Sequence, residues 1–136
     1  PDGTRLVQSA SYGESENTDI YVVDVDGPNV RRLTDHPESD CHPVWSHHGQ
    51  QIVFISHRNG NQDLYRVDCD GSSLRALTMN TADDYSPVWS PSDQWIAFVS
   101  ERDGNKEIYI MAADGSGQVN LTRNPADDEG PAWEPG

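Results

Sequence analysis

One unit of 44 residues is repeated three times along this chain, and the repetition constrains the fold more than any single motif. Tryptophan, proline, tyrosine and aspartate all return at this step. The recurring positions are Trp45, Trp89 and Trp133; Pro43, Pro87 and Pro131; Tyr21, Tyr65 and Tyr109; Asp40, Asp84 and Asp128. A fixed step of this size is typical of repeat architectures, in which each unit packs against its neighbours. We therefore interpret the 136 residues as one domain of three units, 1–46, 47–90 and 91–136, the first of which has a longer polar loop at 11–17.

Each unit has the pattern of four short strands joined by turns, and no stretch keeps helical periodicity. In the third unit we expect strands at 87–90, 95–100 and 107–111, and a short fourth strand that ends at Leu121-Thr122. The turns between them carry Asp-Gly pairs. Tight turns need residues with positive φ, and Asp-Gly pairs adopt this conformation readily. Four antiparallel strands in about 44 residues form one blade of a β-propeller. The predicted fold class is therefore an all-β propeller with three blades in this chain.

Three blades leave a propeller ring open, because closed rings usually have four to eight blades. The chain begins at the turn after an innermost strand, and residues 130–133 have the pattern of an innermost strand. We expect this last strand to complete the first blade of a partner chain, near Leu6-Val7. Two copies would then form a six-bladed homodimeric ring with twofold symmetry. A fragment of a longer chain and a larger ring are the alternatives.

The segment from Trp89 to Gly115, which runs from the end of the second unit through most of the third, reads W-S-P-S-D-Q-W-I-A-F-V-S-E-R-D-G-N-K-E-I-Y-I-M-A-A-D-G. These residues, with the preceding D-x-x-P-x-W-S and the closing L-T, resemble the WD-like propeller repeats of the TolB type, and the resemblance covers all three units. It implies six blades, binding of partner proteins in the bacterial envelope, and a periplasmic or extracytoplasmic location. The first unit departs from the pattern, because Gln8 stands where Phe54 and Phe98 stand and its S-x-R-D-G-N segment is missing.

The charge of the chain restricts its partners. Nine basic residues against 23 acidic ones give a net charge of −14, which opposes binding to nucleic acid or an anionic membrane surface. No apolar run reaches the roughly 20 residues that a membrane helix needs, so we expect no membrane insertion. A protein or a basic peptide remains the favoured partner. Without an initiator Met the chain looks like a processed product or an excised piece, and its two cysteines, Cys41 and Cys69, are too few for a disulfide framework.

Blade topology places the loops after the second and fourth strands on one rim, which is rich in carboxylates. A ring of carboxylates at a channel mouth would concentrate cations and could hold Ca²⁺ or another divalent ion, although we expect no required cofactor. Because the aspartates recur once per blade, we first interpret them as caps of backbone N–H groups. Trp95 breaks the repeat, and Tyr85 is a similar case, so both are contact candidates. The candidate partner-binding residues on the rim are Asp40, His42, Asp84, Tyr85, Trp95, Asp128 and Glu129.

All five histidines lie between His36 and His57, where imidazole and carboxylate groups together could bind a transition metal. The weak metal candidates are His36, Asp40, His42, His57, Asp84 and Asp128. No pair has the regular spacing of a ligand motif, so we prefer to interpret them as surface histidines without a ligand role.

The function that we expect from the sequence is a non-enzymatic scaffold that binds a protein or basic peptide at the acidic rim and channel mouth. Two alternatives stay open. One is a metal-dependent lyase or hydrolase that uses histidines and aspartates of the rim, and the other is a repeat assembly without a dedicated ligand. No G-x-S-x-G motif points to a serine nucleophile.

Overall fold

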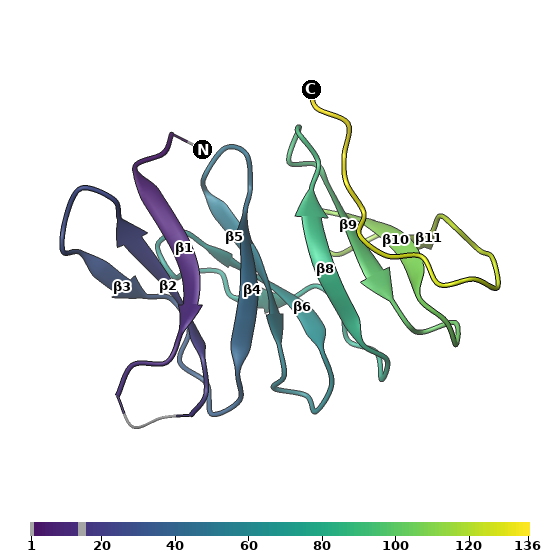
Figure 1. Ribbon diagram of the computed structural model, residues 1–136, viewed down its shortest axis with the longest axis horizontal. Coiled ribbons are helices and arrows are strands. Elements are labelled where there is room, and N and C mark those ends of the chain that lie inside the picture. The colour runs from purple at the N-terminus through teal and green to yellow at the C-terminus, as the bar shows by residue number, and fades with distance from the viewer. Residues whose placement is uncertain (1, 14–15) are drawn as a thin grey trace.

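Three antiparallel sheets stand side by side in chain order in the computed structural model, which describes residues 2–13 and 16–136 (Figure 1). The described residues contain eleven strands and no helix, so the all-β prediction is confirmed. Pro1, in the first predicted turn, and residues 14–15, in the longer loop of the first unit, lie outside the described residues.

Each sheet corresponds to one repeat unit. The first sheet holds β1 (Arg5–Ala10), β2 (Asp19–Asp24) and β3 (Val30–Arg32), in the order β1-β2-β3. The second holds β4 (Asp40–Trp45), β5 (Gln51–Ser56), β6 (Asp63–Asp68) and β7 (Arg75–Ala76). The third holds β8 (Asp84–Trp89), β9 (Trp95–Ser100), β10 (Glu107–Ala112) and β11 (Val119–Asn120). The two four-stranded sheets are propeller blades with β4 and β8 as inner strands, and the described part of the first blade lacks an inner strand.

The inner strands are longer than the sequence predicts. β8 begins at Asp84 rather than at Pro87, and its pairing with β9 shifts between Tyr85 and Val88. The same shift occurs in β4, and the residues inside the two bulges, His42 and Ser86, have φ of 51° and 53°. The proline that follows each of them has no N–H to give to the ladder, so a bulge at this point lets the strand continue on both sides.

Two apolar cores fill the spaces between neighbouring sheets. Ile20 and Val22 of the first sheet pack against Ile52 and Phe54 of the second. Between the second and third sheets, the core residues are Val53, Ile55, Leu64, Leu77, Trp89, Ile96, Phe98, Tyr109 and Met111. Successive side chains of a strand point to opposite faces, so one strand such as β5 contributes to both cores.

The threonine of the repeated Leu-Thr pair forms a polar joint after each outermost strand, and in the first two blades it is buried. The Thr78 hydroxyl accepts a hydrogen bond from the Leu64 N–H at 2.9 Å and donates to Asp63 at 3.2 Å. Thr34 and Thr122 occupy the equivalent positions in the other blades. These hydroxyls therefore hold the chain against the third strand just where the fourth strand ends.

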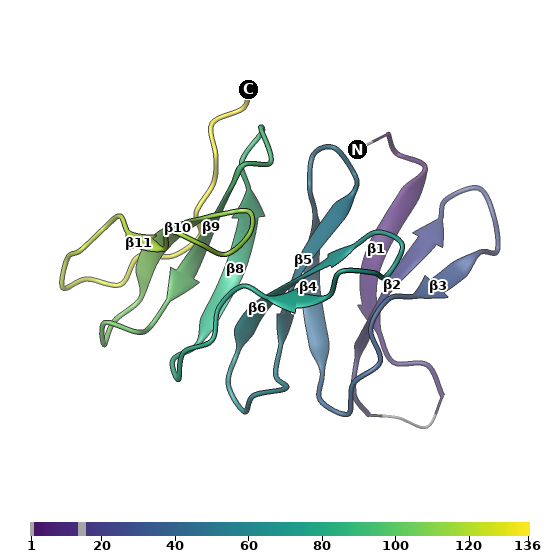
Figure 2. The ribbon, with the colours of Figure 1, turned by 180° about the vertical axis from the view of Figure 1, so that it is seen from behind.

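The Asp-Gly turn of one blade lies on the leucine of the blade before it. Gly115 has φ of 89°, and a Cβ there would stand 3.0 Å from the Leu77 carbonyl oxygen. Only glycine fits such a position, where a positive φ and a close backbone approach coincide. Seen from behind, the turns after β6 and β10 reach toward the preceding sheet (Figure 2).

Residues 130–133, predicted as a strand, are not assigned to a strand. The C-terminal segment runs alongside β8 (Figure 1), where the Trp133 indole is hydrogen-bonded to a β8 carbonyl. An inner strand needs the second strand of its own blade as a pairing partner, and the chain's remaining second strand, β1, lies at the far end of the arc.

Candidate functional site

The loops that follow the second and fourth strands of the blades meet along one rim. We define the acidic rim as residues 33–39, 57–62, 77–83, 101–106 and 121–129. Backbone hydrogen bonds join these loops in pairs: His57 N–H donates to the Ser39 carbonyl at 3.0 Å, and Asp128 N–H donates to the Lys106 carbonyl at 2.8 Å. The loops β5–β6 and β9–β10 lie at the lower end of the molecule in Figure 1. The predicted grouping of these loops on one rim is therefore confirmed.

Asp40 and Asp84, at the inner border of this rim, are buried and each pairs with an arginine. Arg58 Nη2 lies 3.0 and 3.2 Å from the two carboxylate oxygens of Asp40, and Arg102 Nη2 lies 3.1 and 3.2 Å from those of Asp84. Each carboxylate thus pairs with a guanidinium from the following loop. Its role is to stabilise the blade.

The arginines are themselves held in place. Arg58 Nε donates to the Ser56 hydroxyl at 2.8 Å, and its guanidinium lies over the Tyr65 ring, 4.4 Å from the centroid. Arg102 makes the equivalent contacts with Ser100 and Tyr109. The S-x-R segment therefore positions a cation over an aromatic ring and against a buried carboxylate.

The structure corrects the prediction that the repeated aspartates cap backbone N–H groups. That role falls to the residue before each of them. Asp83 accepts a hydrogen bond from Gln62 N–H at 2.9 Å, and Asp127 accepts one from Lys106 N–H at 3.1 Å. Asp40 and Asp84 are instead buried, and each pairs with its arginine.

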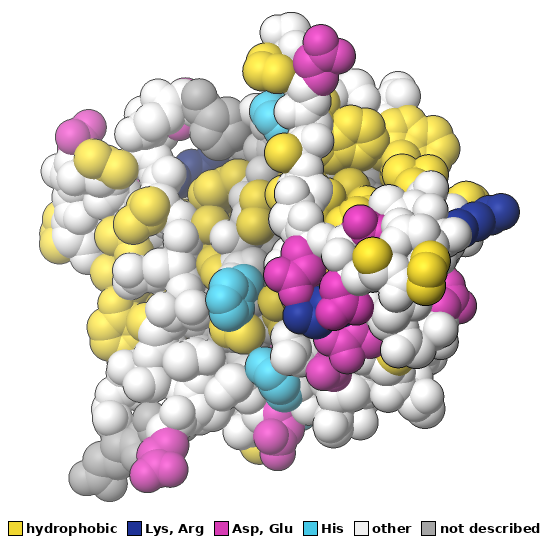
Figure 3. Space-filling view, turned by 45° about the vertical axis from the view of Figure 1, so that its right-hand side comes forward, with side chains coloured by type: hydrophobic (Ala, Val, Ile, Leu, Met, Phe, Trp, Pro, Cys, Tyr) yellow, Lys and Arg dark blue, Asp and Glu magenta, His cyan; other side chains and the backbone are white. Residues whose placement is uncertain are grey.

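Three carboxylates gather around Tyr85 on the third blade. The Tyr85 hydroxyl donates to Glu101 at 2.9 Å, and Lys106 forms an ion pair with Glu129. Asp127 lies near enough for its negative charge to raise the pKa of both Tyr85 and Lys106. Figure 3 shows acidic side chains gathered over the third sheet and the C-terminal segment around a single basic group. We call these five residues the Tyr85 cluster.

The carboxylates of the Tyr85 cluster raise the pKa values of its two other members, Tyr85 and Lys106. Burial, the hydrogen bond to Glu101 and then the charges of Glu101, Glu129 and Asp127 raise the pKa of Tyr85 far above 10.0. The pKa of Lys106 is raised above 10.5, first by its hydrogen bond to Glu129 and then by the same three charges. The same three carboxylates thus contribute to both shifts, because a nearby negative charge favours the protonated form of a group.

Sequence analysis selected only Tyr85 and Glu129 of these five residues. It left out Asp127, beside the selected Asp128, and it also missed the two loop residues Glu101 and Lys106. Neither belongs to a repeated position, because His57 and Gln62 stand at the equivalent places in the second blade. The available signal was topological, since both residues lie in the loop after the second strand of the third blade.

The other predicted site residues are spread over the molecule. His42 is exposed in the bulge of β4, and Asp128 accepts a hydrogen bond from Asn124 at 2.5 Å. Trp95, 42% exposed, starts β9 and so lies at the opposite rim from Ser100, the β9 residue that pairs with Asp84. The structure thus brings Tyr85 and Glu129 together and places Trp95 elsewhere.

The metal candidates do not converge. Within residues 2–13 and 16–136, no three His, Cys, Asp or Glu side chains are grouped as a metal ion would require. His36 Nδ1 accepts the Glu38 N–H at 3.1 Å, and His57 Nδ1 lies 3.2 Å from the Ser39 carbonyl oxygen. Cys41 and Cys69 are free and half-buried.

His47 and His48 lie on the opposite rim, where both contact Asp93 of the next blade. Their backbone N–H groups donate to its carboxylate at 2.7 Å each, and their Nδ1 atoms lie 3.2 and 2.6 Å from it. Burial raises the pKa of Asp93, but the hydrogen bonds from His48 and His47 outweigh burial and lower the pKa below 3.8.

Asp93 should therefore stabilise the fold in a pH-dependent way. A carboxyl group with a lowered folded pKa contributes stability above its unfolded pKa, and this contribution is lost as the pH falls through the folded value. Asp93→Asn should make the free energy of unfolding fall less steeply below about pH 4, as measured by denaturant titration across the acid range. Asp26→Asn, in the exposed turn after β2, is the control and should keep the original profile; an equal change in both variants would contradict the assignment.

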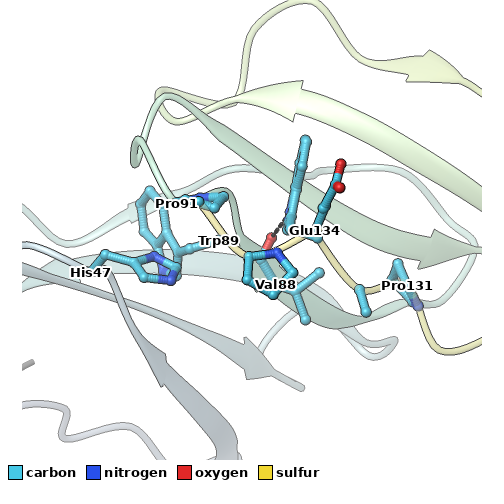
Figure 4. Close-up of a pocket in the computed structure, with 10 residues that line it drawn as sticks. His47, Val88, Trp89, Pro91, Pro131 and Glu134 are labelled. Atoms are coloured by element: carbon cyan, nitrogen blue, oxygen red, sulfur yellow. Dashed lines mark hydrogen bonds between the residues drawn. The ribbon is translucent and has the colours of Figure 1, made fainter.

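A groove of about 720 Å³ lies at the same rim, between β8 and the C-terminal segment. Trp89, Pro91, Pro131 and Trp133 supply most of its apolar lining, and His47 reaches it from the second blade (Figure 4). Sequence analysis assigned no binding residue to this groove. Its walls belong to two successive inner-strand segments, so it is a gap between blades.

Comparisons with known proteins agree with the propeller architecture. A family model described as the TolB beta propeller domain matches residues 1–136. A solved structure assigned as TolB, from Agrobacterium tumefaciens, is 29% identical with a TM-score of 0.78 and covers 88% of this chain and 46% of that one. TolB from Acinetobacter baumannii is 19% identical with a TM-score of 0.75, covering 88% and 31%. No curated protein matches.

A puromycin-hydrolyzing peptidase from Mycobacterium tuberculosis is also similar, at 19% identity and a TM-score of 0.72, over 92% of this chain and 21% of that one. At this identity the likeness shows the fold alone. The chain spans less than half the length of each of these proteins. Among the described residues, no helix is long and apolar enough to cross a membrane. Since the family model covers all three blades and the sheets have the blade topology, the chain belongs to the TolB β-propeller domain family.

Proposed function

We propose that this chain is a non-enzymatic scaffold that binds a protein or peptide with basic side chains at the acidic rim. The observation that carries the proposal is the Tyr85 cluster, where Glu101, Asp127 and Glu129 surround one hydroxyl and one ammonium group. Three carboxylates against one lysine leave the cluster with an excess of negative charge. The aromatic ring beside them offers a face on which the stem or head of a basic side chain can pack.

The net charge of −14 supports the same proposal. Complementary charge speeds the encounter of partners and excludes wrong ones, while rim contacts each add little affinity. A basic segment is therefore favoured as the partner, and an acidic substrate is disfavoured. The fold family includes TolB proteins, and the similar peptidase is matched over only 21% of its length. The alternative of a metal-dependent lyase or hydrolase gains no grouped ligand set from the described residues.

The test is a calorimetric titration of the chain with a peptide rich in lysine and arginine, repeated at rising salt concentrations. We expect binding that weakens steeply with salt, because exposed charge pairs are screened within about 10 Å at moderate ionic strength. The double variant Glu101→Gln with Glu129→Gln should weaken binding by roughly tenfold, as expected if two rim pairs contribute on the order of 0.7 kcal/mol each.

The control is a double variant with the same change in net charge away from the acidic rim. Asp26→Asn with Glu134→Gln removes two exposed carboxylates from the turn after β2 and from the C-terminal segment. This variant should bind the basic peptide as the unmodified chain does. Equal losses in both double variants would mean that only the overall charge matters, and no binding at all would leave an assembly without a dedicated ligand.

We also propose that two copies of the chain make the complete binding surface. A propeller channel has a mouth only when the ring is closed, and three blades do not close one. Two copies related by a twofold axis would supply six blades and would double the acidic rim.

A further inference from the structure

A pocket of about 260 Å³ opens at the acidic rim of the second blade, next to the loop that joins β5 and β6 (Figure 1). The residues that line it are Asn59, Asn61, Asp63, Met79, Asn80 and Thr81. Pockets for drug-sized ligands start at roughly 300 Å³, so this one is slightly smaller. Its size and its place on the rim suit a single side chain of a partner.

The first and third blades show which kind of group fits this place. Arg32, on the outermost strand β3, forms ion pairs with Asp19 at 2.6 Å and with Asp35 at 2.8 Å. Asn120 holds the same position on the outermost strand β11, and its Nδ2 donates to Asp103 at 2.8 Å. Both outermost strands therefore carry a nitrogen donor that reaches a carboxylate of the same blade.

The second blade has a pocket at the place where the first blade has its guanidinium. Ala76 stands one repeat after Arg32, so the buried Asp63 lacks the basic partner that its equivalent Asp19 has. Met79 replaces the exposed carboxylate of the first blade, and both Asp63 and Met79 line the pocket. Among residues 2–13 and 16–136, no basic side chain forms an ion pair with Asp63.

The Asp63 carboxylate is buried, and the groups that bond it are neutral. Asn59 Nδ2 donates to it at 3.1 Å, and the Thr78 hydroxyl donates to it at 3.2 Å. Burial raises the pKa of Asp63 above 3.8, although these two hydrogen bonds act in the opposite direction, and the charge of Asp84 raises it further. Such a carboxylate has already lost its hydration on folding, so a cation that reaches it gains a strong interaction.

Two asparagines of the pocket keep their amide oxygens as acceptors. Asn61 Nδ2 donates to the carbonyls of Asn80 and Ala82 at 3.2 and 2.8 Å, just as Asn59 Nδ2 donates to Asp63. Carbonyls and carboxylates only accept, so the amide nitrogens must face them. Within the described part of the chain, neither amide oxygen receives a hydrogen bond. A planar guanidinium has more N–H donors than an ammonium group and can use several such acceptors together.

We infer that this pocket binds the guanidinium of an arginine side chain from a basic partner, with Asp63 as the counter-charge. The amide oxygens of Asn59 and Asn61 are further acceptors, and the exposed, flexible Met79 packs on the apolar stem of the arginine. The inference rests on the proposed function, which supplies the basic partner, and it adds that the acidic rim selects arginine over lysine.

The first experiment compares two peptides that are identical except that every arginine of one is lysine in the other. In calorimetric titrations of the full chain, we expect the arginine peptide to bind roughly tenfold more tightly, because a guanidinium pairs with a carboxylate through two bonds. Asp63→Asn keeps the size of the side chain and removes its charge. This variant should lose the preference for arginine and keep the affinity for the lysine peptide.

The control for charge is Asp26→Asn, which removes one carboxylate from the exposed turn after β2 and should keep the preference for arginine. Equal affinities of the unmodified chain for the two peptides would overturn the inference and leave the proposed scaffold function in place. If neither peptide binds, the proposed function and the inference both fail.

The second experiment needs no partner. Ala76→Arg rebuilds in the second blade the arrangement of Arg32 and Asp19, so it should raise the midpoint of unfolding and abolish the preference for arginine by filling the pocket. Unfolding is followed in urea, since guanidinium is itself the group that the pocket is inferred to bind. On the Asp63→Asn background the gain in midpoint should disappear, and an equal gain on both backgrounds would overturn the pairing with Asp63. Gln62→Arg adds the same charge outside the pocket lining and should leave the preference for arginine unchanged.

Discussion

Arg102→Ala should lower the free energy of unfolding by about 3 kcal/mol, at the lower end of the cost of breaking a buried ion pair. The Asp84 carboxylate is fully buried, while the Arg102 side chain is 23% exposed. Removing the guanidinium leaves an uncompensated charge inside the blade and also removes the cation from the face of Tyr109. Denaturant titration followed by tryptophan fluorescence measures the loss.

Lys106→Ala is the control for this prediction, because it breaks the exposed pair with Glu129 in the same blade. It should cost less than about 1 kcal/mol, as exposed pairs do. In a double-mutant cycle, Asp84→Asn on the Arg102→Ala background should cost much less than it does alone, since the buried charge is then already unpaired. Additive losses in the cycle would show that the pair contributes no coupling energy.

Phe98→Ala should destabilise the chain by about 3–5 kcal/mol, the usual cost of deleting a buried aromatic ring. Phe98 is fully buried in the core between the second and third sheets, and its ring lies 5.7 Å from that of Tyr109. The cavity would lie between two blades, so it would weaken the contact that holds the third blade to the rest. The expected loss is seen as a lower denaturation midpoint in calorimetry and urea titration.

Gln8→Ala is the matched control, because Gln8 stands at the equivalent position of β1. Gln8 is half-buried and has no aromatic ring to delete. Its replacement should cost less than about 1 kcal/mol, the range of partly exposed side chains outside special contacts. A loss at Gln8 as large as that at Phe98 would contradict the assignment of the loss to the deleted aromatic ring.

Much of the blade was predictable because the repeat carries it. The second and third strands, the Asp-Gly turns and the pairing of arginines with carboxylates recur with the same residues in the second and third units. The bulges in β4 and β8 were not predicted, although the proline inside each strand was the available signal. The capping role was assigned to Asp40 and Asp84 when it belongs to Asp83 and Asp127, because the pattern does not say which of two adjacent carboxylates faces the blade.

The candidate site was less predictable than the blade. Sequence analysis selected repeated rim residues, and two of these, Asp40 and Asp84, are buried in ion pairs. The Tyr85 cluster combines residues that do not repeat, such as Glu101 and Lys106, with two that were predicted, Tyr85 and Glu129. Their proximity depends on the bulge at Tyr85 and on the course of the chain after β11.

The amino-acid sequence by itself determined the unit of this protein: four strands every 44 residues, apolar on both faces, with fixed turns and a charge that favours basic partners. Those properties depend on residues close in the chain or at the same place in the next unit, so the repeat reveals them. Only the tertiary structure decided which carboxylates are buried in ion pairs, as Asp40 and Asp84 are, and which meet around Tyr85. The physical reason is that burial and charge clustering depend on which residues lie next to one another in space, and residues that do not repeat become neighbours only when the loops of the rim come together.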